Sequence, residues 1–401
     1  MNRVPRGCSN IGGESAERLE FCRGSAMKLF ASYGYKPFSP SEFQLIESVW
    51  GRISPSRSRR LIPIMSPFGE PCVLRGDVTL SAAEYLSAHF ESDERPLRLS
   101  YADRVFSAPV APKSNLEENQ VRVELIGWEG EGADCEVVTL LLKTLETLSI
   151  ENYLIVLGDA SFVSHLFAPL AKNKASLLIN SLQEGSYTSY FQILETLEAE
   201  ESYLELLRSL PSMKGNISVI GEMMSKVKDS FVLSPLKNLC YSLCKLGFED
   251  KVRVDFSFIR DLGYYSGPIF NAYSSSDGSL LGGGGRYDGL LAQIGEEGEG
   301  VGFALNLKEL AERCRSSYPH PEMMLWCGKC DTAEALRYAD GLCRKGISFE
   351  LNWERDSCAA MRTARLRGYK WWADCRAKRV ISLQTGADSS LADFERTILS
   401  C

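Results

Sequence analysis

Apolar residues near the start of the chain recur with the period of a helix. Between residues 14 and 31 they mark one helical face: Leu19, Cys22, Ala26, Leu29 and Phe30. Gly34 follows this segment, where a glycine commonly ends a helix. The pattern therefore predicts an amphipathic helix over residues 14–31, and a second helix is predicted over residues 137–148.

Residues 120–127 alternate with the period of a strand. The apolar face of this strand holds Val121, Val123 and Leu125. Its polar face holds Gln120, Arg122 and Glu124. By itself, the pattern favours a half-exposed antiparallel strand with solvent on its polar side. The alternative is that the polar row faces a ligand.

The rest of the chain divides into three segments with different residue patterns. Residues 155–245 are rich in Leu, Ser and Glu and carry helical patterns, which predicts a helical insertion. From Ile259 the pattern becomes strand-like, with glycines that indicate turns or close backbone approach. Residues 321–401 are predicted to form a small α/β domain. The strands predicted in it are Met323–Trp326, Ile347–Trp353 and Val380–Leu383.

Composition and charge narrow the class of protein. The chain has 401 residues, which is enough for two or three domains with a sizeable core. Its net charge of -7 gives no overall attraction to nucleic acid or to an anionic membrane, and neither is expected as a partner. No stretch is long and apolar enough to span a bilayer, and the 13 cysteines lack the spacing of a disulfide framework. We therefore expect a soluble, cytoplasmic protein with reduced thiols.

Three patterns that could carry chemistry are weak. The glycine run 282–285 precedes Arg286 but lacks the ending of a phosphate-binding loop. Cys327 and Cys330 have the spacing of a redox pair, yet Pro321 is the last proline of the chain, so none can face the pair as in thioredoxin. The three histidines form no cluster, and no metal site or cofactor is predicted.

Five segments, in order along the chain, carry a family resemblance. They are Leu74–Thr79, Gln120–Gly127 with Ala133–Glu136, Arg260–Gly267, Gly284–Leu290 and Val301–Leu305. Together they resemble the histidyl-tRNA synthetase family. The resemblance implies an α+β fold over residues 1–315, with a class II synthetase-like antiparallel sheet of six or seven strands flanked by helices. It would be interrupted by the helical insertion and followed, over residues 321–401, by a degenerate anticodon-binding-like domain or one specific to this lineage.

The same resemblance implies a histidine pocket. Its residues would be Asp77, Thr79, Gln120, Glu124, Arg260, Tyr264 and Tyr265. Asp77 and Thr79 would hold the α-ammonium group, and Arg260 would lie near the carboxylate. Tyr264 and Tyr265 would wall the imidazole ring. These residue types suit a zwitterion, because it needs an anion for its ammonium and a cation for its carboxylate.

The positions expected to bind ATP depart from the family pattern. Phe106 is followed by Ser107, where the family has the arginine that binds the α-phosphate of ATP. Glu309 stands where a second ATP-binding arginine is expected, and its charge would repel phosphate. Without these cations, the charge that develops on the α-phosphate during amino-acid activation loses its stabilisation. We therefore expect no catalytic residues.

Within the family, the pattern is most similar to the regulatory subunits of ATP phosphoribosyltransferase. Asp77 before a threonine and the opening residues 4–9 carry this similarity. It implies a homodimer within a hetero-oligomer, paired through the first helix and residues 35–40. The implied partners are the short-form catalytic subunit and L-histidine as feedback inhibitor. Two alternatives remain: a working histidyl-tRNA synthetase, and a paralogue that binds another ligand through the altered loop 260–263.

Overall fold

The computed structural model describes residues 4–53, 58–90, 94–109, 115–260, 265–294, 298–316 and 321–399. Chain contacts divide it into two compact units, Met1–Ser317 and Tyr318–Cys401. None of the helices in the described ranges combines the length and the apolar character that are required to cross a membrane.

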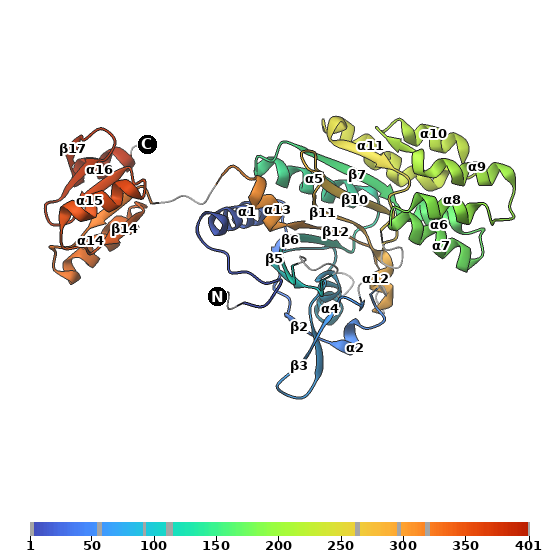
Figure 1. The fold of residues 1–401 in the computed structure, drawn as a ribbon, viewed down its shortest axis with the longest axis horizontal. Helices are drawn as coiled ribbons and strands as arrows, with labels where there is room; N and C mark the ends of the chain where they lie inside the picture. The colour runs from blue at the N-terminus through green and yellow to red at the C-terminus, as the bar shows by residue number, and fades with distance from the viewer. Residues whose placement is uncertain are drawn as a thin grey trace. The chain divides into compact units, whose positions relative to one another are not determined.

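A large sheet forms the centre of the first unit (Figure 1). Among the described residues its nine strands are, in spatial order, β1 (Lys36–Pro37), β5 (Leu97–Phe106), β6 (Glu117–Ile126), β12 (Gly300–Asn306), β11 (Leu280–Arg286), β10 (Pro268–Ser274), β7 (Tyr153–Asp159), β9 (Val252–Asp255) and β8 (Lys214–Gly215). The neighbours from β5 to β7 in this order are all antiparallel, as the class II resemblance implies. The sheet is wider than the expected six or seven strands, because β1 adds to one edge in parallel and β9 with β8 adds to the other.

One face of the sheet is apolar and is covered by helices. They are α1 (Gly13–Ser32), α5 (Glu131–Thr147), α11 (Ser234–Lys245) and α13 (Leu307–Arg313), which lie above the sheet in Figure 1. Phe30 of α1 packs edge-on against Phe303 of β12 with ring centroids 5.8 Å apart. Val121 and Val123 of β6 are fully buried in the same core. The apolar row of the strand pattern therefore faces the helices.

Smaller elements cover the polar face of the sheet. They are α2 (Ile46–Val49), α4 (Thr79–His89), α12 (Asp288–Gln293) and a three-stranded sheet of β2 (Phe43–Leu45), β4 (Pro71–Leu74) and β3 (Ile62–Met65). Figure 1 shows α4, α12 and this small sheet below the large sheet, on the side away from α1 and α13. The polar row of β6 is thereby enclosed between the large sheet and this cover.

A group of short helices extends the first unit beyond β7. They are α6 (Ala160–Phe167), α7 (Lys172–Gln183), α8 (Tyr187–Leu194), α9 (Glu201–Ser209) and α10 (Val219–Lys226), and α11 continues the group. The helical insertion was expected from residue 155, but residues up to Asp159 belong to β7. A strand buried between neighbours can show an apolar run that periodicity does not separate from a helix. Asp159 then begins α6 by accepting hydrogen bonds from the backbone N–H groups of Ser161 and Phe162.

The second unit is a sheet with helices on both faces. Within the described residues its strand order is β14 (Phe349–Asn352), β13 (Met323–Trp326), β15 (Trp371–Asp374), β16 (Arg379–Ser382) and β17 (Asp388–Ser390). The helices are α14 (Thr332–Arg344), α15 (Ser357–Leu366) and α16 (Leu391–Leu399). Alternate residues of β13 face opposite cores: Leu325 packs with α14 residues and Met324 packs with α15 residues. This unit therefore has a core of its own.

Candidate ligand-binding site

Two adjoining cavities lie on the polar face of the large sheet. The inner cavity has a volume of about 60 Å³ and the outer one about 240 Å³. They share the lining residues Asp77, Arg122, Arg260, Gly283 and Ala304, so the two cavities are neighbours. These residues come from the β4–α4 connection, from β6, from the segment after β9 and from β11 and β12.

Glu124 of β6 closes the inner cavity. Its side chain is 2% exposed. One carboxylate oxygen accepts hydrogen bonds from Thr79 (2.7 Å) and Tyr101 (2.9 Å), and the other accepts from the hydroxyl of Tyr287 (2.5 Å). A Cβ at Gly302 of β12 would collide with Glu124, so a glycine is required opposite it. Burial raises the pKa of Glu124 to about 7, although these three donors and Arg122 act in the opposite direction.

The raised pKa of Glu124 predicts that the first unit loses stability as pH rises. Between pH 4.5 and about 7 the folded protein keeps a proton that the unfolded chain has released, so folding becomes less favourable across this window. A shift from 4.5 to about 7 corresponds to about 3 kcal/mol. Glu124→Gln, which is neutral at every pH, should flatten the decline measured by chemical unfolding between pH 5 and 8. An unchanged slope in this variant would contradict the assignment.

Arg122 links two of the expected ligand residues. Its guanidinium donates to the Gln120 side-chain oxygen from Nε (2.8 Å) and Nη2 (2.6 Å). Its Nη1 lies 3.5 Å from Oδ1 of Asp77, and that oxygen also accepts the backbone N–H of Thr79 at 2.7 Å. Arg122 is 7% exposed. It therefore holds Asp77 and Gln120 in place and brings a positive charge into both cavities.

Arg260 lies on the opposite side of the cavities. Its Nη1 donates to Oδ1 of Asn271 (3.0 Å) and to the Phe270 carbonyl (3.3 Å), and its guanidinium carbon lies 5.1 Å from the centre of the Tyr265 ring. A Cβ at Gly283 would collide with Asn271 and lie 2.7 Å from Arg260 Nη1. The glycine run, expected at a turn or close approach, thus forms strand β11, and Gly283 leaves room for the arginine over the sheet.

The structure gathers most of the residues that the resemblance implied. Asp77, Thr79, Gln120, Glu124, Arg260 and Tyr265 all line the inner or the outer cavity. Tyr264 lies outside the described residues. The sequence reasoning missed Arg122, Tyr101, Tyr287 and Asn271. Arg122 could have been found, since it shares the polar face of the strand with Gln120 and Glu124, whereas Tyr101 has no signal in the sequence.

Of the two positions that depart from the family pattern, Ser107 lines a cavity and Glu309 does not. Phe106 and Ser107 line the outer cavity, and Arg60 donates to the Ser107 hydroxyl at 3.0 Å. Glu309 lines neither cavity and is bound by Nη1 of Arg313 at 2.8 Å. The charge of Glu309 is thus partly compensated by its neighbour Arg313 in α13.

The large sheet is antiparallel at its centre, is packed by helices on one face and encloses a polar pocket on the other. These features define the class II aminoacyl-tRNA synthetase fold. The family model described as Histidyl-tRNA synthetase matches residues 7–310. The chain belongs to the histidyl-tRNA synthetase family.

Similar proteins are named either as ATP phosphoribosyltransferase regulatory subunits or as histidyl-tRNA synthetases. ATP phosphoribosyltransferase regulatory subunits of Bacillus subtilis and Carboxydothermus hydrogenoformans are 28% and 29% identical to this chain. The alignments cover 86% and 79% of this chain, and 90% and 98% of the respective relatives.

Solved structures agree on the fold. A Bacillus halodurans structure described as an ATP phosphoribosyltransferase regulatory subunit/histidyl-tRNA synthetase has a TM-score of 0.82 at 22% identity, covering 93% of this chain and 97% of the other. Histidyl-tRNA synthetase from Nostoc sp. also has a TM-score of 0.82, at 17% identity, with 99% of both chains covered.

Proposed function

We propose that this chain is a non-catalytic regulatory subunit of ATP phosphoribosyltransferase in histidine biosynthesis. It assembles with the short-form catalytic subunit, enables its activity and mediates feedback inhibition by L-histidine. The observation that carries the proposal is a polar pocket with both signs of charge beside Ser107, where an ATP-binding arginine is expected. The names of the relatives in Bacillus subtilis and Carboxydothermus hydrogenoformans support the same role.

The pocket offers complementary groups for a zwitterionic amino acid. Asp77 supplies the anion for the α-ammonium, and Arg122 and Arg260 supply cations for the carboxylate. The buried Glu124 and the ring of Tyr265 supply a polar end and an aromatic face for the imidazole. Tyr264 belongs to the same proposal as the second aromatic wall.

Feedback in this proposal is a coupling free energy. Histidine inhibits only if it binds one state of the complex better than the other. The factor by which histidine lowers the affinity for ligands of the active state must equal the factor by which those ligands lower the affinity for histidine. No residue of this chain needs to take part in the transfer reaction itself.

The proposal includes a homodimer within the hetero-oligomer, paired through α1 and residues 35–40. β1 supports this arrangement, because it is an edge strand and pairs only with β5 among the described strands. An edge strand offers unpaired N–H and C=O groups to a second copy.

Assembly is tested by size-exclusion chromatography with a short-form catalytic subunit from the same source. We expect one complex that elutes ahead of both components. Separate elution of two folded proteins over the micromolar range would contradict the regulatory proposal and favour a synthetase paralogue with another ligand.

A second candidate function is amino-acid activation by a working synthetase. It is favoured by the cations of the outer cavity, which is lined by Arg60, Arg122 and Arg260. Histidine-dependent exchange of pyrophosphate into ATP separates the two candidates. We expect no exchange above background, since Ser107 stands where the family has the arginine that binds the α-phosphate of ATP.

A further inference from the structure

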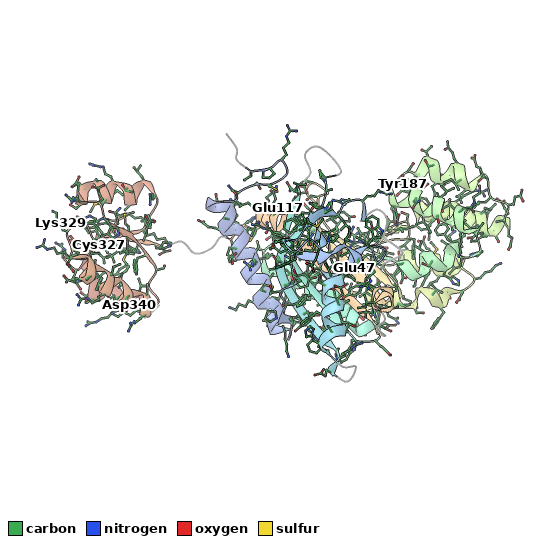
Figure 2. All side chains as sticks on the ribbon, turned by 90° about the horizontal axis from the view of Figure 1, so that it is seen from below. Glu47, Glu117, Tyr187, Cys327, Lys329 and Asp340 are labelled. Atoms are coloured by element: carbon green, nitrogen blue, oxygen red, sulfur yellow. The ribbon has the colours of Figure 1, made fainter. Side chains whose placement is uncertain are left out.

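Three cysteines from two segments that are distant in sequence meet in the second unit. Cys327 and Cys330 lie in the turn between β13 and α14, and Figure 2 labels Cys327 and Lys329 in this turn. Cys375 directly follows β15. Trp326 and Asp374 are partners in the parallel pairing of β13 with β15, so Cys327 and Cys375 occupy the next position of neighbouring strands.

The backbone fixes these positions. The amide of Cys375 donates to the Trp326 carbonyl at 3.0 Å, and the amide of Cys330 donates to the Cys327 carbonyl at 3.0 Å. Adjacent strands lie about 4.8 Å apart, so Cys327 and Cys375 fall within the Cα separation of about 4.4–6.8 Å that a disulfide requires. The Cys375 thiol interacts electrostatically with the thiols of both Cys327 and Cys330. It is therefore the common partner of the cluster.

The members of the cluster differ in access to solvent. Cys327 and Cys375 are each 1% exposed, whereas Cys330 is partly exposed. The ionisable groups that act on the thiols are Asp374, Lys378 and Tyr338. Burial raises the pKa of Cys330 to about 11, with Lys378 acting in the opposite direction. No group of His, Cys, Asp or Glu in the described part of the chain is arranged to hold a metal ion.

We propose that Cys330, Cys375 and Cys327 form a thiol–disulfide exchange site in the second unit, with low-molecular-weight disulfides as its oxidants. Cys330 is the thiol that a small molecule can reach, and Cys375 is the resolving thiol that it contacts. This site is independent of the pocket in the first unit and of the proposed regulatory function.

The exchange is balanced by the oxidant. The Cys330 thiol loses its proton to solvent, and the thiolate attacks one sulfur of a disulfide R–S–S–R, forming a mixed disulfide and releasing one RS⁻. Cys375, once deprotonated, attacks the Cys330 sulfur, and the second RS⁻ leaves. Two protein thiols are oxidised to one disulfide, and R–S–S–R is reduced to two thiols that take up the two protons.

The test uses the reduced full-length protein and oxidised glutathione, followed by acid quenching, alkylation and mass spectrometry of unreduced peptides. We expect a disulfide that links Cys330 to Cys375. Because the thiolate is the nucleophile and the pKa of Cys330 is raised to about 11, its rate of formation should rise about tenfold per pH unit between pH 7 and 9.

Matched variants separate this site from general thiol oxidation. Cys375→Ser should accumulate a glutathionyl group on Cys330, and Cys330→Ser should leave Cys327 and Cys375 as thiols. Cys358→Ser removes an exposed cysteine of α15 and should leave the Cys330–Cys375 disulfide unchanged. Glutathionylation confined to the exposed Cys343 and Cys358 in the wild-type protein would overturn the proposal. If Cys375→Ser formed a disulfide as fast as the wild-type protein, Cys375 would not belong to the exchange site.

Discussion

Arg286→Met is expected to lower the free energy of unfolding of the first unit by about 3–5 kcal/mol, the cost of removing one partner from a buried ion pair. Arg286 is 6% exposed and binds the carboxylate of Asp134, which is 4% exposed, with Nε at 3.0 Å. It also forms ion pairs with Asp288 and Glu299. Methionine would leave three carboxylates close together without their cation.

The stability change is measured by differential scanning calorimetry, in which the two units can unfold separately. Asp134→Asn in the Arg286→Met background removes one of the stranded charges, so the double variant should recover part of the lost stability. A loss below about 1 kcal/mol, the value typical of exposed pairs, would contradict the structural role of this network. Arg286 would then not owe its place in the Gly284–Leu290 segment to this network.

Asp77→Asn is expected to weaken L-histidine binding about 10- to 100-fold, since a hydrogen bond to a charged group contributes about 1.5–3 kcal/mol. The amide keeps the shape of the side chain and an oxygen for the Thr79 N–H, but it removes the charge that the α-ammonium requires. Isothermal titration calorimetry gives the affinity of both proteins. Assembly with the catalytic subunit should be unaffected, because the pocket is enclosed within the first unit.

The matched control for this variant is Glu47→Gln. Glu47 is an exposed acidic residue of α2, labelled in Figure 2, and it lines neither cavity. The same loss of one negative charge should leave histidine affinity unchanged there. Equal affinities of the wild-type protein and Asp77→Asn would show that the ammonium group is bound elsewhere and that the transferred pocket is wrong.

The elements with strong periodicity were predictable from the sequence. The helix predicted over residues 14–31 is α1, and the strand predicted over Met323–Trp326 is β13. β13 is a continuous run of four apolar residues, whereas β15 (Trp371–Asp374), which has the same length, was missed because it ends in the charged Asp374. The parallel pairings of β1 with β5 and of β7 with β9 were also missed, because pairing between distant segments depends on tertiary packing that local pattern does not contain.

The site, like the fold, was predictable from the sequence only in part. The alternation of Gln120 and Glu124 indicated a polar face, but solvent and ligand give the same pattern along one strand. Only the cover of α4 and the small sheet makes that face a pocket wall. Tyr101 reaches Glu124 from the neighbouring strand β5, and no spacing in the sequence expresses a contact across strands.

The regulatory role is tested by the rate of phosphoribosyl-ATP formation by a short-form catalytic subunit, with and without this protein, as L-histidine is titrated. We predict that the protein activates the reaction and that histidine reverses the activation in the wild-type complex at concentrations that leave the Asp77→Asn complex active. A rate that this protein does not change, while both proteins are folded, would contradict the regulatory role.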